Sequence, residues 1–349
     1  MVAELPRCPV PRTGVSPRER VLLSFAHQQP DFCPHSMGFT QDSYKKMAEF
    51  YGDPLWGGKI GNHFATTGPN LLWTEPAPGY ARDGFGVIWN RSVDKDIGVV
   101  EEPLLAEPTL EGYELPDAHD PGLYQHLAPF VANNPNHFRM ANIGFSLFER
   151  AWTLRGMENL LIDMILHPEF VEELLDAICD WNVAAVHHLA AHDFDAIGFG
   201  DDWGQQHGLI MGPEHWHHFL KPRLKRMYDA VHEHGMYVWI HSCGDVQSLF
   251  GDLIELGANC FNPFQPEAQD VEEAKRVYGD RLAFHGGVSL QQTLSRGTPA
   301  EVRAEVRRRI EVIGRDGGYV LAPCHAVTGD VPAENIHAML EETFAQYDA

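Results

Sequence analysis

Two segments of the chain place potential metal ligands directly after short apolar runs. His241 and Cys243 end one such run, and Cys324 ends another. Side chains two residues apart on an extended chain point to the same side, so His241 and Cys243 can face one ion. One imidazole and two thiolates with an open fourth position are typical of catalytic Zn²⁺. The alternative for the pair alone is a buried cysteine beside a packing histidine.

Carboxylates follow another strand-like run. Asp201 and Asp202 follow residues 196–199 after a single Gly, and His207 comes a few residues later. Carboxylates in such a position bind a substrate hydroxyl, act as a general acid or approach a metal. We predict catalytic roles for Asp201, Asp202 and His207. An Asx turn that caps the next helix is the alternative.

Other residues at the ends of apolar runs are candidates for substrate binding. A mainly aromatic group follows the first clear run and is predicted to wall an apolar pocket, although core packing is an alternative for its rings. A glutamine and a histidine stand after two later runs. The predicted substrate-binding residues are Phe145, Phe148, Glu149, Trp152, Gln265 and His285.

Short apolar runs alternate with helical patterns from about residue 137 onward. Such runs suit parallel strands that are covered on both faces. A strict β-then-α order implies a parallel sheet with right-handed crossovers. We predict an α/β fold, a (β/α)8 TIM-type barrel whose strands all end at the face that carries the active site. The predicted strands are 137–143, 196–199, 237–240, 258–261, 282–284 and 319–321.

The first part of the chain has a different character. Residues 52–121 are rich in Gly, Pro and aromatic residues and include a predicted hairpin of residues 86–91 and 97–100. We predict an N-terminal helical and hairpin extension over residues 1–136, packed on a main barrel region over 137–349. The two parts are expected to form one structural domain.

Charge and composition narrow the class of function. The net charge of -23 gives no electrostatic basis for binding nucleic acid or an anionic membrane. No apolar run approaches the ~20 residues that span a bilayer. Residues 1–16 lack an apolar signal core, so we expect a cytoplasmic protein. The six cysteines are scattered, which favours free thiols and metal ligands over a disulfide framework.

At these residues the chain resembles the uroporphyrinogen decarboxylase superfamily. The resemblance extends over nearly the whole length and is carried by residues 17–31, 235–245, 262–266, 278–287 and 317–324. It implies a (β/α)8 barrel, in agreement with the pattern of runs. The decarboxylases of this superfamily are metal-free and carry an Arg-rich N-terminal loop, whereas residues 33–40 of this chain contain no Arg.

The resemblance is strongest to the branch of zinc-dependent, corrinoid-linked methyltransferases. His241, Cys243 and Cys324 match the zinc ligands of that branch position by position. The resemblance implies transfer of a methyl group to or from cobalamin. The other reactant is a small methylated substrate, such as an aryl methyl ether, or a thiol. A separate corrinoid-binding protein is the expected partner, because the chain has no cobalamin-binding motif. A metal-free decarboxylase and a non-catalytic tetrapyrrole or corrinoid binder remain as alternatives.

Overall fold

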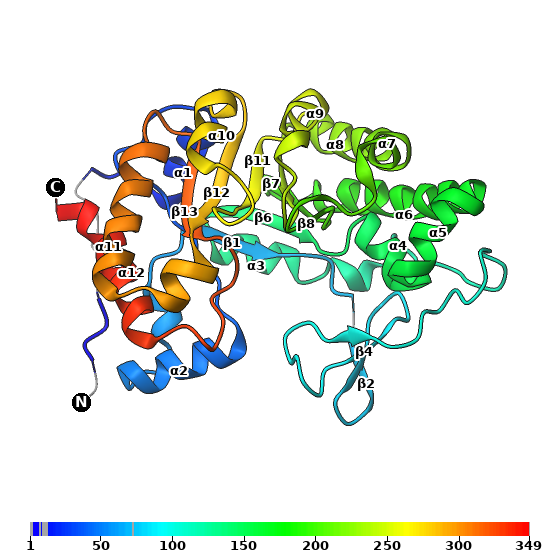
Figure 1. The fold of residues 1–349 in the computed structure, drawn as a ribbon, viewed down its shortest axis with the longest axis horizontal. Helices are drawn as coiled ribbons and strands as arrows, with labels where there is room; N and C mark the ends of the chain where they lie inside the picture. Colours follow the sequence, from blue (N-terminus) through cyan, green and yellow to red (C-terminus); the bar gives the residue numbers. More distant parts are fainter. Residues whose placement is uncertain (1–2, 7, 9–12, 72, 349) are drawn as a thin grey trace.

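The computed structural model describes residues 3–6, 8, 13–71 and 73–348 (Figure 1). Its central sheet has seven strands in the order β1-β6-β7-β10-β11-β12-β13, and every neighbouring pair is parallel. All six predicted strands are present, which confirms the predicted fold class. Their bounds, with the additional β1, are β1 (Phe64–Thr67), β6 (Phe138–Ile143), β7 (Ala196–Gly200), β10 (Tyr237–His241), β11 (Cys260–Phe264), β12 (Ala283–Val288) and β13 (Tyr319–Pro323).

Helices follow the strands and cover the outside of the sheet (Figure 1). A proline at the first position of α6 separates it from α5, because its missing N–H is tolerated at that position. Within the described ranges, no helix is long and apolar enough to span a bilayer. The α-helices are α1 (Pro17–Phe25), α2 (Gln41–Tyr51), α3 (Leu127–Asn133), α4 (Phe148–Arg155), α5 (Met157–Leu166), α6 (Pro168–Leu189), α7 (Gly212–His215), α8 (Lys221–Glu233), α9 (Phe250–Leu256), α10 (Val271–Tyr278), α11 (Pro299–Arg308) and α12 (Ala333–Ala345).

An extended segment, residues 34–36, lies between the first and the last strand of the sheet and is called the closing segment below. The Leu321 N–H of β13 donates to the Pro34 carbonyl, and the Ser36 N–H donates to the Leu321 carbonyl. On the other side of the segment, the N–H of His63, directly before β1, donates to the carbonyl of His35. The segment therefore takes the place of an eighth strand and closes the barrel.

Helix α1 packs against the N-terminal end of the barrel. Its Val21 and Phe25 join Phe64, Phe138 and other residues in an apolar cluster. The first turn of α1 is fixed by the Ser16 side chain, which accepts from the Glu19 N–H in a capping box. Because apolar side chains occupy this end, polar chemistry is left to the C-terminal ends of the strands.

A second, antiparallel sheet projects from the barrel at the lower right of Figure 1. Its strands are β2 (Thr74–Ala77), β3 (Tyr80–Arg82), β4 (Ile88–Asn90) and β5 (Val99–Val100). The pairing of β4 with β5 confirms the predicted hairpin. Arg150 of α4 fixes this sheet to the barrel through a 2.7 Å ion pair with Asp83, which also accepts from the Phe85 and Val87 N–H groups.

The predicted boundary at residue 136 needs correction. Strand β1 lies within the region assigned to the extension, yet it pairs in register with β6 as part of the barrel. The segment around His35 also belongs to the barrel wall. The pattern missed β1 because it has four residues and Phe64 is its only buried one. The barrel therefore begins upstream of residue 137, and the extension is interleaved with it.

Candidate functional site

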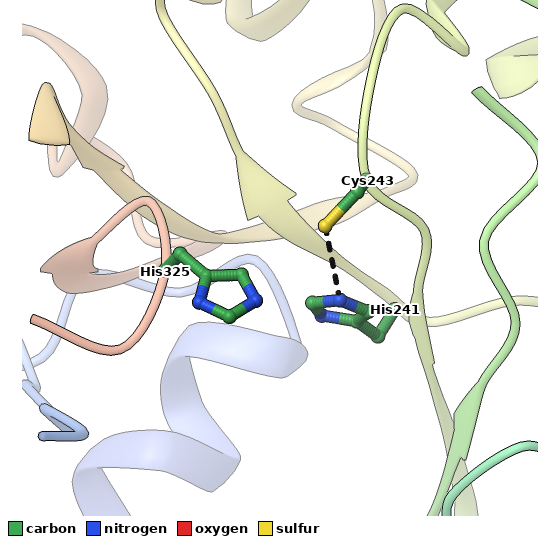
Figure 2. A group of neighbouring side chains, drawn as sticks. All are labelled: His241, Cys243 and His325. Atoms are coloured by element: carbon green, nitrogen blue, oxygen red, sulfur yellow. Dashed lines mark hydrogen bonds between the residues drawn. The ribbon is translucent and has the colours of Figure 1, made fainter. Parts of the chain in front are cut away.

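The C-terminal ends of β10 and β13 bring three potential ligands together. These are His241, the last residue of β10, Cys243, and His325, two residues after β13 (Figure 2). One ligand atom of each lies within 4.8 Å of the other two. The His241 Nε2 atom is 3.4 Å from the Cys243 Sγ atom. Tetrahedral Zn²⁺ bonds of about 2.0 Å to N and 2.3 Å to S would separate these atoms by about 3.5 Å, so the pair fits a zinc ion.

A neighbouring amide orients the His241 ring. His241 Nδ1–H donates to Asn262 Oδ1 at 2.6 Å, and Asn262 Nδ2–H donates to the His285 carbonyl at 2.9 Å. The second bond determines which end of the amide is oxygen, and the first therefore places the proton of His241 on Nδ1. Nε2 then carries the free electron pair toward Cys243. Hydrogen bonds of this kind typically orient metal-binding histidines.

Asp202 lies directly beside the pair. Its Oδ1 accepts from the Cys243 N–H at 2.8 Å and lies 3.5 Å from His241 Nε2. Burial, and then the charge of Asp202, raise the pKa of the Cys243 thiol. A divalent ion would reverse this effect, because its charge favours the thiolate.

Cys324 is placed differently from the sequence expectation. Its side chain is buried, and its Sγ atom lies 3.8 Å from Glu267 Oε2 rather than within the group of three donors. Burial raises the pKa of its thiol to about 12. The adjacent His325 turns its ring toward His241, with 5.8 Å between the ring centroids. Sequence reasoning missed His325, although it follows the same apolar run, because the family motif pointed to the cysteine.

Three cavities share His325 in their lining. The aromatic cavity, of about 580 Å³, also includes His241 and Asp202. The amide cavity, of about 380 Å³, lies on the thiol side and includes Cys243, Cys324, Gln205, Gln206, Gln265 and Gln291. The barrel-mouth cavity, of about 480 Å³, includes His241, Asn262, His285 and Ser36.

The predicted substrate-binding residues divide among these cavities. Phe145, Glu149 and Trp152 line the aromatic cavity, and Gln265 lines the amide cavity. His285 lines the barrel mouth, where its Nε2–H donates to the Ser36 carbonyl and burial lowers its pKa to about 4. Phe148 is fully buried in the core and lines none of the three described cavities.

Two of the three predicted catalytic residues lie away from the cavities. Asp201 is fully buried, and its carboxylate accepts from Trp203 Nε1 at 2.6 Å and from the Glu149 N–H at 2.8 Å. Burial raises the pKa of Asp201 to about 6. Its contacts hold the start of α4 against the end of β7. His207 is exposed on the turn between β8 (Gly204–Gln205) and β9 (Gly208–Leu209).

Two tryptophans of the aromatic cavity were not predicted. Trp89 comes from β4 of the projecting sheet, and Trp239 lies two residues before His241 on β10. The two-residue spacing was a usable signal for Trp239, because it places both side chains on the same side of the strand. For Trp89 the signal was weaker, namely its place in the aromatic-rich residues 52–121, because its position depends on how the projecting sheet folds back.

The described residues that line the three cavities include no Lys or Arg. Arg150 lies near the aromatic cavity, with its guanidinium carbon 5.6 Å from the centroid of the Phe145 ring, but it is paired with Asp83. The cavities therefore contain carboxyl groups, imidazoles, amides and thiols without a cationic side chain.

Comparison with known proteins places this barrel in a family. The model of the uroporphyrinogen decarboxylase (URO-D) family matches residues 97–345. A uroporphyrinogen decarboxylase of Methylococcus capsulatus is 26% identical over 185 residues, which are 51% of this chain and 49% of the relative. A methylcobamide:CoM methyltransferase, MtbA, of Methanosarcina acetivorans is 24% identical over 173 residues, which are 50% of this chain and 48% of the relative. The chain thus matches about half the length of each of these two relatives.

A solved structure shares the fold. A methyltransferase from Methanosarcina mazei superposes with a TM-score of 0.71 at 18% identity, over 95% of this chain and 98% of that chain. At this identity the likeness shows a shared fold. The curated relatives are enzymes of two kinds, decarboxylases and methyltransferases. Because the family match extends over most of the sequence, the chain belongs to the uroporphyrinogen decarboxylase (URO-D) family.

Proposed function

We propose that this chain is a zinc-dependent methyltransferase that moves a methyl group between a small molecule and cobalamin. The observation that carries the proposal is the group of His241, Cys243 and His325, whose ligand atoms lie within 4.8 Å of one another beside an aromatic cavity. His241 and Cys243 are the proposed common ligands. The third is one of two adjacent residues: Cys324, from the family motif, or His325, from the geometry.

A bound zinc ion would supply positive charge that holds a thiol as a thiolate or polarises the heteroatom of a methyl donor. The residues around it perform the remaining tasks. Asn262 keeps the Nε2 electron pair of His241 directed at the ion, and Asp202 holds the backbone of Cys243 in place. Asp201 fixes the start of α4 and thereby the position of Glu149 in the aromatic cavity.

The cavities suit a reaction between two molecules. Of the three potential metal ligands, His241 and His325 line the aromatic cavity, whereas Cys243 and His325 line the amide cavity. We propose that the small methylated substrate occupies the aromatic cavity. The cobalamin comes from a separate corrinoid protein in this proposal.

The metal-free decarboxylase is the rival function, because several curated relatives carry that name. Its octacarboxylate substrate would need cationic side chains to balance many negative charges. The cavities offer none among their described lining residues, and the whole chain carries a net charge of -23. We therefore favour methyl transfer.

Metal analysis and methyl transfer together test the proposal. Purified protein should contain one zinc per chain, and with cob(I)alamin and a panel of methyl ethers, amines, sulfonium compounds and thioethers it should form methylcobalamin, measured by absorbance. Cys243→Ser should lose the zinc and lower turnover at least ~100-fold with little change in thermal unfolding, since the ligand lies at the barrel mouth. His218→Ala, an exposed histidine paired with Glu172, is the matched control.

Three results would contradict the proposal. Protein without stoichiometric zinc that decarboxylates uroporphyrinogen would support the rival function. Global unfolding of Cys243→Ser would assign the metal a structural role instead. If His241→Ala kept full turnover, the group of three donors would have no part in the reaction.

A further inference from the structure

We propose that the aromatic cavity binds a methylated onium cation, a small molecule with a quaternary ammonium or a sulfonium group. The inference rests on the proposed methyl transfer and names the class of methyl donor at the same site. It differs from the aryl methyl ether suggested by the sequence, because it requires a positive charge on the ligand.

Aromatic rings from three different parts of the chain surround this cavity. They are Trp89 of the projecting sheet, Phe145 before α4 with Trp152 within it, and Trp239 of β10. The ring centroids of Trp89 and Phe145 are 4.9 Å apart at 45°, and those of Phe145 and Trp152 are 6.5 Å apart at 82°. Rings at such different angles present several faces and edges to one volume. Methylated cations are bound by such groups of rings, because aromatic faces attract positive charge.

The acids in the cavity, Glu149 and Asp202, have no Lys or Arg beside them among the described lining residues. Burial, and then the charges of Asp202 and Asp201, raise the pKa of Glu149 well above its usual range. Neighbouring carboxyl groups in an apolar cavity are stabilised by a cation between them. The nearby Arg150 cannot serve, because it is held by Asp83 outside the cavity.

The backbone at Phe145 also points to a built site. Phe145 has φ of 50°, in the left-handed region that aromatic residues rarely adopt. The next residue is fixed in place, because the Ser146 N–H and Oγ–H both donate to the Gly200 carbonyl. Such strain persists where the surrounding structure enforces it, and it is concentrated at functional sites. Here it aims an aromatic ring at Trp89.

The charge of the ligand also suits the reaction. When cob(I)alamin attacks a methyl group of a quaternary ammonium ion, its cobalt supplies the electron pair of the new Co–C bond. The C–N bond breaks, and both of its electrons stay on nitrogen, which leaves as a neutral tertiary amine. A sulfonium ion likewise leaves as a neutral thioether. No proton transfer is needed, so Glu149 and Asp202 serve to bind the cation. Because a quaternary nitrogen has no free electron pair, a bound zinc ion would act on the leaving amine as its electron pair is freed, and not on the intact donor.

Binding measurements separate charge from shape. Choline and its neutral isostere 3,3-dimethyl-1-butanol are titrated into the full-length protein by calorimetry and tryptophan fluorescence, with anisole as the neutral aromatic probe. Choline should bind at least ~10-fold more tightly than either neutral compound. Tetramethylammonium and trimethylsulfonium chloride then distinguish an ammonium from a sulfonium site.

Substitutions test which groups recognise the cation. Glu149→Gln should weaken choline binding ~10-fold and leave 3,3-dimethyl-1-butanol unchanged, because only the charge is removed. Trp152→Leu should weaken choline binding by a similar factor, and Trp152→Phe should restore most of it. Glu101→Gln is the control, since Glu101 lines a separate cavity on the projecting sheet. Thermal unfolding of each variant verifies that it is folded.

Several outcomes would overturn the inference. These are equal binding of choline and its neutral isostere, tighter binding of anisole, or no binding of any onium probe at about 10 mM. The proposed function can fail separately. Protein that lacks zinc yet binds choline would retain the cation site without the methyltransferase. Protein that holds zinc and demethylates only neutral ethers would keep the function and refute the onium ligand.

Discussion

The aromatic and amide cavities present two different chemistries to the same group of ligands. The aromatic cavity is lined by four large rings and two carboxyl groups, whereas the amide cavity is lined by four glutamines and two thiols. Both include His325. The first cavity suits a cation with apolar substituents, and the second suits a neutral partner with hydrogen-bonding groups. In the proposed reaction, two unlike molecules would approach the ligand group from these separate sides.

The largest expected effect comes from a substitution that should disrupt the aromatic cavity and leave the metal ligands in place. Arg150→Met leaves Asp83 as an unpaired buried carboxylate, and both side chains are at most 3% exposed. We expect the free energy of unfolding to fall by about 3–5 kcal/mol. Because Asp83 also accepts from Trp89 Nε1, choline binding should weaken as well. Urea denaturation and calorimetry measure these losses.

The zinc content of Arg150→Met tests whether the aromatic cavity and the metal ligands are independent of each other. Zinc should stay near one per chain at temperatures where the variant is folded. The double variant Asp83→Asn/Arg150→Met should recover part of the stability, since it removes the unpaired charge. If zinc is lost in proportion to stability, the aromatic cavity and the metal ligands form one unit, which would contradict two separate cavities with separate roles.

The next largest effect identifies the third metal ligand, which is either Cys324 or His325. Cys324 lines the amide cavity, whereas His325 lines all three cavities. One of the variants Cys324→Ser and His325→Ala should lower zinc affinity at least ~100-fold, since each ligand of a four-coordinate site carries roughly a quarter of about 10–16 kcal/mol. The other should lower it less than ~10-fold. Competition with a chelating dye measures both, and two small effects would contradict a three-residue site.

A smaller effect is expected at Asn262, which lines the barrel-mouth cavity and orients the His241 ring. Asn262→Leu removes the acceptor of His241 Nδ1–H, so the ring loses its fixed orientation. Zinc affinity should fall about 10–100-fold. Asn262→Asp keeps an acceptor oxygen and should restore most of the affinity. An unchanged affinity in Asn262→Leu would show that neighbouring contacts orient the ring without this bond.

The smallest effect is expected at the rim of the amide cavity. His207 is exposed on the turn that follows Gln205 and Gln206, which line that cavity. His207→Ala should change turnover less than about 2-fold, as is usual for exposed substitutions. A loss of 10-fold or more would restore the catalytic role predicted from the sequence and would show that the turn closes over the substrate.

The sequence predicted well those parts of the fold that have a local pattern. Strands buried on both faces appear as apolar runs, so β6 to β13 of the barrel were found, and the spacing of His241 and Cys243 placed them on one side of β10. Phe145, Glu149 and Trp152, which come after β6, line the aromatic cavity. Their role in binding stays a prediction.

Other parts depend on contacts between distant segments. Trp89 reaches the aromatic cavity because an ion pair between Asp83 and Arg150, 67 residues apart, holds the projecting sheet there. The segment around His35 contains Pro34 and forms isolated bridges, so no local period marks it as part of the barrel wall. His325 follows Cys324 directly, and only the direction of the chain after β13 decides which of the two side chains faces His241.

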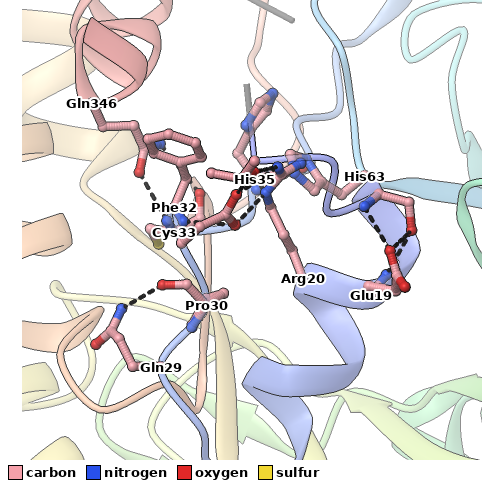
Figure 3. Close-up of polar contacts among 12 residues, drawn as sticks. Glu19, Arg20, Gln29, Pro30, Phe32, Cys33, His35, His63 and Gln346 are labelled. Carbon is pink, nitrogen blue, oxygen red and sulfur yellow. Dashed lines mark hydrogen bonds and ion pairs between the residues drawn. The ribbon is translucent and has the colours of Figure 1, made fainter. Parts of the chain in front are cut away.

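The closing segment has a consequence for how the chain folds. Figure 3 shows its polar contacts: the Cys33 N–H donates to Gln346, and nearby Arg20 of α1 is buried at the same junction. His35 pairs with Leu321 of β13, so this contact joins residues that are 286 positions apart in the sequence. Contacts of such high sequence separation form slowly, because the intervening chain must first be ordered. During synthesis, the segment around His35 therefore keeps an unpaired edge until β13 has emerged, and an exposed edge of this kind is prone to aggregation.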